Sequence, residues 1–507
     1  MTLLQSDQIN NLSLSSTKEY LHQYTQAIHQ QSQYIKLMEK KLEALVTELG
    51  VNNQQVLATK EQLENFKAEK FGQSSERRGG SDPLQSSLES NSTTGENQKK
   101  AERKKRTEFG RTEQLDLAKQ DVEYRFGADT VADLGLKVWT NQFETSKMVH
   151  LIPTKLVFQT HLRQKYHTPD GKIMTAPGPL KLKEGSRYTI EFATEVGIRK
   201  YDLHLPLDRQ VKDFRSLGLS VKSQTLFDQV DTVAWYLQGH VMPLLMKEKN
   251  ESRLHIADDT WWNNLEKKEL RESAKFYLWG VISGRATIYQ LYDGRNQKVA
   301  KHFLGDCQGV LLTDGHPSFS PLQNENLLWA NDWSHVRRYF IKAEKLFPAE
   351  AKFFLDKIRK LFLLEREFSG KSLDEIKSLR QEKSKLITED IYSNLLNMKN
   401  TLPSLSLGKA VHYTLNLWKG LTLFLEQPQV LIHSNEIENG LRGPVVGRKN
   451  HFGSRSLETG MVASTWYSVI TSCYRNNVDP RTYINATIRR ILEKKPVQAP
   501  WDFTSDK

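Results

Sequence analysis

The stretch from Arg253 to Asp314 limits the fold of this chain more than any other segment. RLHIADDTWW, KFYLWGVISG and RATIYQLYDG are rich in β-branched and aromatic residues, so we predict three strands, the last two joined at a glycine turn. NQKVAKHFLGD has the spacing of a helix, and GVLLTDG is typical of a buried strand that ends in acid. This order predicts an α/β domain built on a mixed sheet.

Acidic residues lie where the apolar character of two of these strands stops. Asp258 and Asp259 follow RLHIA, and Asp314 follows GVLLT. Successive side chains on a strand point to opposite faces, so only one of Asp258 and Asp259 can face a site shared with Asp314. A lone aspartate at a strand end is usually a turn or helix cap. Two of them on neighbouring strands favour a carboxylate site on a ribonuclease H-like sheet.

A basic helix and a long helical segment follow. LLWANDWSHVRRYFIKAEKLF predicts a strand passing into a helix, in which Arg337 and Arg338 either meet a phosphate or cover a solvated face. Residues 343–425 have a helical hydrophobic period almost throughout, so we expect a helical insertion within the sheet domain.

The block NEIENGLRGPVVGRKNHFGS contains two more candidate acids. Glu436 and Glu438 are two residues apart, so on a helix they point in nearly opposite directions and only one can serve a given site. From the residues alone, the simpler explanation of Glu438 is a surface ion pair with Arg442, four residues further on.

The N-terminal part has a different character. Apolar residues recur every seven positions from Ile35 to Leu63, which predicts a coiled coil within residues 1–72; an amphipathic helix folded back on the protein is the alternative. Residues 73–112 turn to Ser, Gly, Asn, Gln and Lys, the composition of a disordered basic linker.

Two further segments precede the sheet domain, and one follows it. Residues 113–200, with KLVFQTHL and YTIEFAT, predict a small strand-rich module. Residues 201–250 predict helices around a glycine turn: a helix-turn-helix presenting Lys222 and Gln224 to DNA, or an ordinary helical hairpin. Residues 456–507 are expected to form a helical C-terminal segment.

Bulk properties narrow the class of protein. At 507 residues the chain suggests about three or four domains. A net charge of +12 favours a polyanionic partner. Two cysteines, Cys307 and Cys473, provide neither a disulfide framework nor a cysteine-rich zinc site. No long apolar run and no signal peptide are present, so we expect a soluble, cytoplasmic protein without membrane contact.

Seven short motifs are spread in order over most of the chain. They are FKAEKFGQSSER (66–77), YDLHLPLDRQ (201–210), ADDT (257–260), LLTDG (311–315), WSHVRRYF (333–340), NEIENGLRGPVVGRKNHFGS (435–454) and NNVDP (476–480). Taken together, these motifs closely resemble those of transposases of the insertion sequence 66 family. The resemblance implies a ribonuclease H-like DDE catalytic domain, here residues 251–455, with catalytic and metal-binding Asp258, Asp314 and Glu438.

The resemblance also implies a reaction and its partners. We expect metal-dependent cleavage at the ends of a mobile element, then attack of the freed 3′-hydroxyl on target DNA, with two Mg²⁺ ions per site or Mn²⁺ in their place. Expected partners are terminal inverted repeats, target DNA, further copies of the chain and small accessory transposition proteins. A catalytically inactive or domesticated DNA-binding derivative and a hydrolysis-only nuclease of the same fold are the alternatives.

The block after Glu438 is expected to hold DNA. Glycines there would let a hinged loop approach the backbone, while cationic side chains meet phosphates. The expected DNA contacts are Arg442, Arg448, Lys449, Asn450 and Arg455. Family members usually carry a cysteine zinc module where residues 113–200 lie, but this segment contains no cysteine, so no zinc is expected.

Overall fold

The computed structural model describes residues 14–49, 54–71, 133, 155–167, 172–266 and 275–504. Residues 1–72 and 159–507 belong to one compact unit, which contains every element described below. The predicted basic linker, residues 73–112, and most of the predicted strand-rich module lie outside the described residues.

A five-stranded mixed sheet forms the centre of this unit, in the order β5-β4-β3-β6-β7. Strands β3, β4 and β5 pair with one another in antiparallel fashion, whereas β6 and β7 run parallel to β3. Helix α11 (Gln297–Leu304) connects the two groups. The predicted α/β class and mixed sheet are therefore confirmed. The strands are β3 (Leu254–Asn263), β4 (Lys275–Ser283), β5 (Ala286–Tyr292), β6 (Gly309–Thr313) and β7 (Leu327–Asn331).

Helices cover the sheet because most strand residues are apolar on both faces. Central β4 and β6 are almost wholly buried, as expected of strands covered on two sides. Helix α19 (Leu457–Arg475) packs on β5, and α18 (Asn435–His451) packs on β3 and β4. Ser472 and Ser468 of α19 donate hydrogen bonds to carbonyl oxygens of β5, which fixes that helix on the strand.

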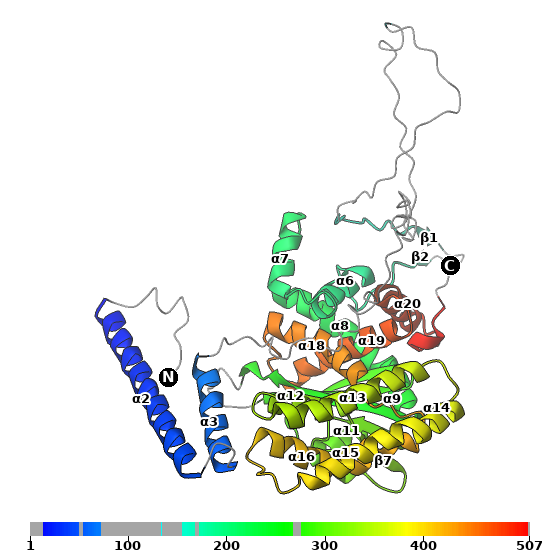
Figure 1. Ribbon diagram of the computed structural model, residues 1–507. Coiled ribbons are helices and arrows are strands. Elements are labelled where there is room, and N and C mark those ends of the chain that lie inside the picture. The colour runs from blue at the N-terminus through cyan, green and yellow to red at the C-terminus, as the bar shows by residue number, and fades with distance from the viewer. Residues whose placement is uncertain are drawn as a thin grey trace. The chain divides into compact units, whose positions relative to one another are not determined.

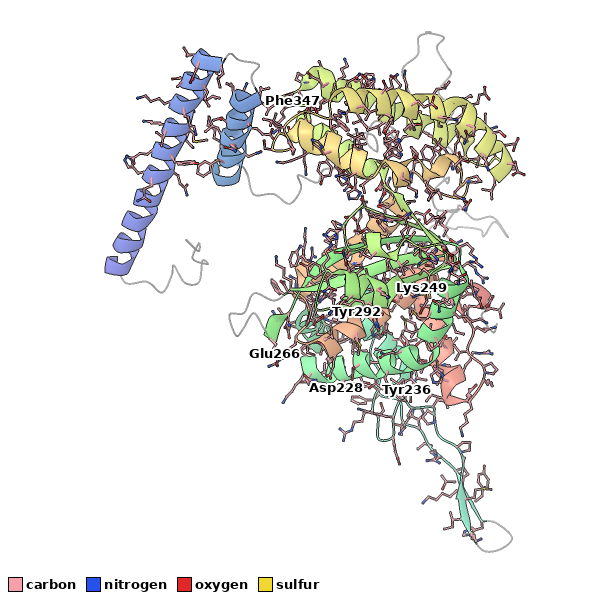
Figure 2. The ribbon with its side chains drawn as sticks, turned by 90° about the horizontal axis from the view of Figure 1, so that it is seen from below. Asp228, Tyr236, Lys249, Glu266, Tyr292 and Phe347 are labelled. Atoms are coloured by element: carbon pink, nitrogen blue, oxygen red, sulfur yellow. The ribbon has the colours of Figure 1, made fainter. Side chains whose placement is uncertain are left out.

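The segment predicted as a helical insertion is helical in the structure. Figure 2 shows its helices, drawn in yellow, gathered beside the sheet. One buried arginine ties them to the returning chain: Arg380 bonds Glu365 and the carbonyl oxygens of Phe424, Pro428 and Val430. Helix α12 (Trp333–Ala343) precedes the insertion, whose elements are α13 (Pro348–Phe368), α14 (Leu373–Leu379), a π-helical turn (Arg380–Ser384), α15 (Lys385–Asn397), α16 (Ser406–Asn416) and α17 (Trp418–Leu421).

The N-terminal helices depart from the predicted seam. Helix α2 (Leu14–Leu49) ends before Gly50, and α3 (Gln54–Phe71) packs back against it (Figure 1). The rings of Tyr34 and Phe66 lie 4.9 Å apart, and Lys67 pairs with Glu39 at 2.8 Å. The apolar residues that recur from Ile35 to Leu63 therefore lie on two separate helices. A coiled coil between chains stays a prediction.

Residues 155–200 are less strand-rich than predicted. Among the described residues of this stretch, 155–167 and 172–200, only β1 (Lys165–His167) and β2 (Ile173–Thr175) pair, as an antiparallel ribbon. KLVFQTHL has no regular structure, and YTIEFAT enters helix α6 (Ile190–Tyr201), so both strand predictions were wrong. Thr189 caps α6 by accepting a hydrogen bond from the Phe192 amide, and the buried residues of α6 follow a helical spacing.

The predicted helix, glycine turn and helix are present between residues 207 and 240. Helix α7 (Leu207–Ser216) leads through Gly218, with φ of 91°, into α8 (Ser223–His240). Helix α8 packs against α6, α19 and α20 (Pro480–Leu492), and α9 (Met242–Glu251) continues toward the sheet. Helix α8 is thus built into the helices that cover the sheet, whereas α7 projects from α6 and α8 (Figure 1).

Candidate active site

The two predicted catalytic aspartates, Asp258 and Asp314, lie where strands β3 and β6 stop pairing. We expected β3 to end near Asp258 and Asp259. Instead, Trp261 and Trp262 continue the pairing with β4 as far as Asn263. Its pairing with β6, however, stops at Ile256 opposite Leu312. Asp258 lies two residues beyond that point, and Asp314 directly follows the last residue of β6.

Asp258 points to the face of the sheet that α18 covers. Its cross-strand partner is Gly280 of β4, and directly opposed residues share a face. A Cβ atom added to Gly280 would lie 3.2 Å from Cδ1 of Ile437, the neighbour of Glu438 on α18. The helix that carries Glu438 therefore packs over the face toward which Asp258 points.

The pKa of Asp258 reflects its burial and the charged groups around it. Burial raises its pKa to about 7, and the charges of Asp314 and Asp259 act in the same direction. The nearby imidazole of His335 opposes this rise. Without a cation, the cluster of carboxyl groups is thus electrostatically unfavourable at neutral pH.

Asp259 points the other way and binds an arginine that the sequence analysis missed. Its Oδ2 accepts a hydrogen bond from Arg295 Nε at 2.7 Å, while Arg295 Nη2 lies 3.3 Å from Asp314 Oδ2. Burial raises the pKa of Asp259 to about 6, although Arg295 opposes the rise. No sequence pattern marked Arg295, which stands in an ordinary turn, YDGRN.

Glu438 lies in the first turn of α18, beside the basic helix α12. Its Oε1 forms an ion pair with Arg338 Nη2 and lies 4.0 Å from His335 Nδ1. The surface pair with Arg442, considered from the sequence, is replaced by this longer-range pair with Arg338. Glu438 is thus tied to α12, which starts just after β7.

A buried aspartate connects the starts of α12 and α18. Asp332 accepts hydrogen bonds from the Ser334 amide at 2.6 Å, from Ser434 Oγ at 2.6 Å and from His335 Nδ1 at 3.0 Å. Burial favours the neutral acid, but the charge of His335 and the hydrogen bonds from His335, Ser434 and the Ser334 amide together lower the pKa of Asp332. In return, the pKa of His335 is raised, because Asp332 outweighs the effect of burial.

Three ligand atoms of Asp332, His335 and Glu438 lie within 4.8 Å of one another. Asp332 already accepts three hydrogen bonds from the protein, which occupy most of its acceptor capacity. This trio is therefore better explained as a hydrogen-bonded junction than as a cation site. The insertion joins the same region through Tyr413, whose hydroxyl donates to the carbonyl oxygen of Asp314.

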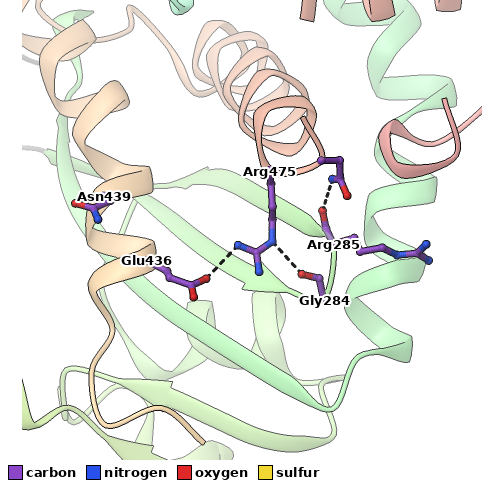
Figure 3. Close-up of a pocket in the computed structure, with 6 residues that line it drawn as sticks. Gly284, Arg285, Glu436, Asn439 and Arg475 are labelled. Carbon is purple, nitrogen blue, oxygen red and sulfur yellow. Dashed lines mark hydrogen bonds and ion pairs between the residues drawn. The ribbon is translucent and has the colours of Figure 1, made fainter. Parts of the chain in front are cut away.

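Glu436 and Glu438 bind different partners, as we predicted from their spacing on a helix. Glu436 accepts a hydrogen bond from Arg475 Nη1 at 3.1 Å and lines a hollow of about 630 Å³ (Figure 3). Gly284, Arg285, Asn439 and Asn476 complete that hollow with Arg475, and none of the three predicted catalytic acids lines it.

The block after Glu438 is not the glycine-hinged loop that we expected. It forms α18, which contains Pro444 and ends at His451. A Cβ atom at Gly447 would lie 2.1 Å from the Tyr467 hydroxyl, so this glycine permits close packing of α18 on α19. Only at Gly453, with φ of 119°, does the chain need a left-handed glycine.

Arg448 does not lie where a DNA contact would require it. It is 5% exposed, donates from Nη1 to Thr260 Oγ1 at 3.0 Å, and also bonds the carbonyl oxygen of Trp261. Its guanidinium carbon lies 3.7 Å from the centre of the Trp261 ring. Its predicted role at phosphate is therefore corrected: Arg448 fastens α18 to β3.

The other predicted DNA contacts lie at or near the surface. Arg337 is half-buried, and Arg338 forms the pair with Glu438. Asn450 donates to the carbonyl oxygen of His204 at 3.1 Å. Their contact with DNA stays a prediction. The remaining exposed members are Arg442, Lys449 and Arg455 around α18, and Lys222 and Gln224 at the start of α8.

The family of this chain follows from its similarity to known proteins. Residues 185–462, more than half of the chain, match the family described as "Transposase IS66 family". The chain belongs to this family. The match spans α6 to α19 and so includes the sheet, the insertion and all three predicted acids.

Relatives of this IS66 family transposase occur in Sinorhizobium fredii (strain NBRC 101917 / NGR234). The chain is 26% identical to uncharacterized protein y4jD over 389 residues, covering 72% of this chain and 76% of the relative. Uncharacterized protein y4qI is 26% identical over 486 residues, covering 90% and 85% respectively. Within the described part of this transposase, no helix is both long and apolar enough to cross a membrane.

Proposed function

We propose that this transposase cuts the ends of its element in a metal-dependent reaction and transfers the freed 3′-hydroxyl to target DNA. Asp258, Asp314 and Glu438 are the proposed catalytic carboxylates. The observation that carries this proposal is the convergence of Asp258 and the Glu438-bearing helix on one face of the sheet, beside Asp314 at the end of β6.

The topology supports a ribonuclease H-like catalytic domain. Three antiparallel strands lead through α11 to two parallel strands, with the first strand at the centre of the sheet. The helical segment then separates β7 from α18. Such an arrangement would allow acids that are distant in sequence to share one site, as a DDE enzyme requires.

The donor set fits hard divalent cations. Mg²⁺ and Mn²⁺ prefer oxygen ligands, which the carboxylates of Asp258, Asp314 and Glu438 would supply. The raised pKa of Asp258 has the cause expected of such a site, since burial and neighbouring carboxylates disfavour its charge. When bound, a pair of such ions would activate the attacking oxygen and stabilise the leaving oxygen during phosphodiester exchange.

The side chains around the acids have separate proposed tasks. Asp332 fixes His335 and Ser434, and through them orders the start of the helix that carries Glu438. Arg338, whose side chain is 47% exposed, lies beside Glu438 and can offer its remaining donors to a phosphate. Arg442, Lys449 and Arg455 would hold the DNA backbone near the carboxylates.

The proposal includes the nucleic-acid and protein partners. The substrates would be terminal inverted repeats and target DNA, and the N-terminal helices would help further copies of the chain hold two ends together. Small accessory transposition proteins are proposed as additional partners. Lys222 and Gln224, at the exposed start of α8, would contact DNA outside the catalytic site.

Strand transfer tests the proposed reaction against its alternatives. Purified protein, end DNA, a target plasmid and Mg²⁺ should give products in which the 3′-ends of the element are joined to the plasmid. Cleaved ends without joined products would indicate a hydrolysis-only nuclease. DNA binding without cleavage, in both Mg²⁺ and Mn²⁺, would indicate an inactive derivative.

A further inference from the structure

The two aspartates of the ADDT motif face opposite sides of β3. On the side of Asp259, the sheet fixes a turn that contains Arg295. The cross-strand partner of Asp259 is Trp279, which shares its face. The indole Nε1 of Trp279 donates to the carbonyl oxygen of Gly294 at 3.3 Å. The turn between β5 and α11 is therefore fixed on the face of Asp259.

That turn presents Arg295 in a defined orientation. On its far side, Asn296 caps α11 by accepting a hydrogen bond from the Val299 amide at 3.1 Å. Arg295 thus stands between a residue bonded to the sheet and a residue bonded to a helix. Its Nε reaches Asp259, whose side chain is 3% exposed, while its Nη2 reaches Asp314.

The contacts of Asp314 show what this arrangement achieves. Its Oδ1 accepts a hydrogen bond from the His316 amide at 2.9 Å, and its Oδ2 lies 3.3 Å from Arg295 Nη2. Each carboxylate oxygen thus has one protein partner and keeps a lone pair for another ligand. A planar guanidinium with two differently placed donors fixes both position and direction, which a lysine ammonium does not.

We infer that Asp259 and Arg295 are positioning residues for the proposed catalytic carboxylate Asp314. Asp259 anchors Arg295, and Arg295 orients Asp314 from the face opposite α18. This inference rests on the proposed function, because it takes Asp314 to be a metal ligand. The two acids of ADDT thus have different tasks. Asp258 faces the proposed site, and Asp259 holds Arg295, which orients Asp314.

Some substitutions leave the net charge unchanged. These variants distinguish an effect on the orientation of Asp314 from an effect of charge alone. The double variant Asp259→Asn with Arg295→Gln removes one charge of each sign, and Arg295→Lys keeps the cation but loses the two-pronged geometry. Arg285→Lys is the matched control, since Arg285 bonds Glu248 through Nε at 3.2 Å and Nη2 at 3.0 Å in the turn between β4 and β5.

Mn²⁺ binding by the full-length protein, measured by calorimetry without DNA, tests the inference directly. We expect the Kd for Mn²⁺ to rise about 10-fold or more in the double variant and in Arg295→Lys, the loss typical of a disturbed ligand support. Arg285→Lys should bind Mn²⁺ as wild type does. Cleavage of end DNA should slow in parallel, and thermal unfolding shows whether each variant is folded.

Three results would overturn the inference. Unchanged Mn²⁺ affinity in a folded double variant would make the Asp259–Arg295 pair purely structural. Tighter binding in Arg295→Gln than in wild type would make Arg295 a competitor of the cation. A wild-type protein that binds no Mn²⁺ would remove the site. If wild type binds Mn²⁺ but cuts no DNA, the proposed function fails, and the Mn²⁺ affinities alone decide the inference.

Discussion

Arg338 of α12 and Glu438 of α18 form an ion pair between helices 100 residues apart in the chain. The pair occupies an oxygen of the carboxylate that we assign to metal binding. Because α12 follows β7 directly, the ion pair also ties the start of α18 to the parallel edge of the sheet.

Replacing Arg338 should separate its two effects. In Arg338→Gln, Glu438 loses a competing cation, so Mn²⁺ should bind several-fold more tightly in calorimetry. Affinity for end DNA should fall, because one phosphate-binding cation is lost. The matched variant Arg337→Gln on the same helix should leave Mn²⁺ affinity unchanged. Weaker Mn²⁺ binding in Arg338→Gln would mean that the ion pair orients Glu438 and does not compete for it.

The pKa of Asp258 predicts a pH-dependent stability in the absence of metal. The carboxyl has an ordinary value of 3.8 in the unfolded chain and about 7 in the folded protein, so folding favours its protonated form. Stability should therefore fall as pH rises from about 4 to about 7, and remain low above pH 7.

Asp258→Asn removes this penalty. In EDTA, its melting temperature should exceed that of wild type at pH 8 and match it at pH 4. The gain at pH 8 should be a few kcal/mol, since each pKa unit corresponds to about 1.4 kcal/mol. A destabilised Asp258→Asn protein at pH 8 would show that Asp258 is not under electrostatic strain.

Two glycines of α18 provide a test of its packing. Gly447→Ala should lower the free energy of unfolding by about 1–3 kcal/mol, because the new methyl group would overlap the Tyr467 hydroxyl. Gly443→Ala should be neutral or stabilising, since its nearest neighbour, His204, lies 3.8 Å away and alanine favours helix.

Removing the hydroxyl should relieve the overlap at Gly447. Gly447→Ala combined with Tyr467→Phe should therefore be more stable than Gly447→Ala alone, as judged by urea unfolding. Equal stability of the Gly443→Ala and Gly447→Ala variants would contradict the close contact between α18 and α19.

Arg380 should hold the insertion to the chain that leads to α18. Its side chain is 3% exposed and pairs with Glu365, so Arg380→Met leaves a carboxylate without its partner and four carbonyl oxygens without their donor. A loss of about 3–5 kcal/mol in unfolding free energy is expected. Lys383→Met, at the exposed Lys383–Glu367 pair, should cost less than about 1 kcal/mol.

Local patterns were sufficient to predict the sheet domain. The succession of three strands, helix α11 and a further strand follows from apolar runs broken by glycine turns, and the aspartates mark where β3 and β6 separate. The predicted divergence of Glu436 and Glu438 is confirmed, since their partners are Arg475 and Arg338. Helical periodicity alone indicated that residues 343–425 form helices.

Other features depend on contacts that no local pattern encodes. The glycines of α18 suggested a hinge, but Gly440 and Gly447 instead accommodate Tyr289 of β5 and Tyr467 of α19, contacts that no local spacing encodes. YTIEFAT has strand-forming residues, yet the Thr189 cap and burial against α8 and α20 favour a helix. Arg295 could not be recognised, because its partners are fixed by the pairing of strands and not by spacing.

Cleavage of end DNA by three acid variants decides whether Asp258, Asp314 and Glu438 are catalytic. Asp258→Asn, Asp314→Asn and Glu438→Gln should each lose Mg²⁺-dependent cleavage by at least about three orders of magnitude while still binding the DNA. Glu436→Gln, on the same helix but paired with Arg475, should cut as wild type does. Wild-type rates in any folded variant of the three acids would contradict the account.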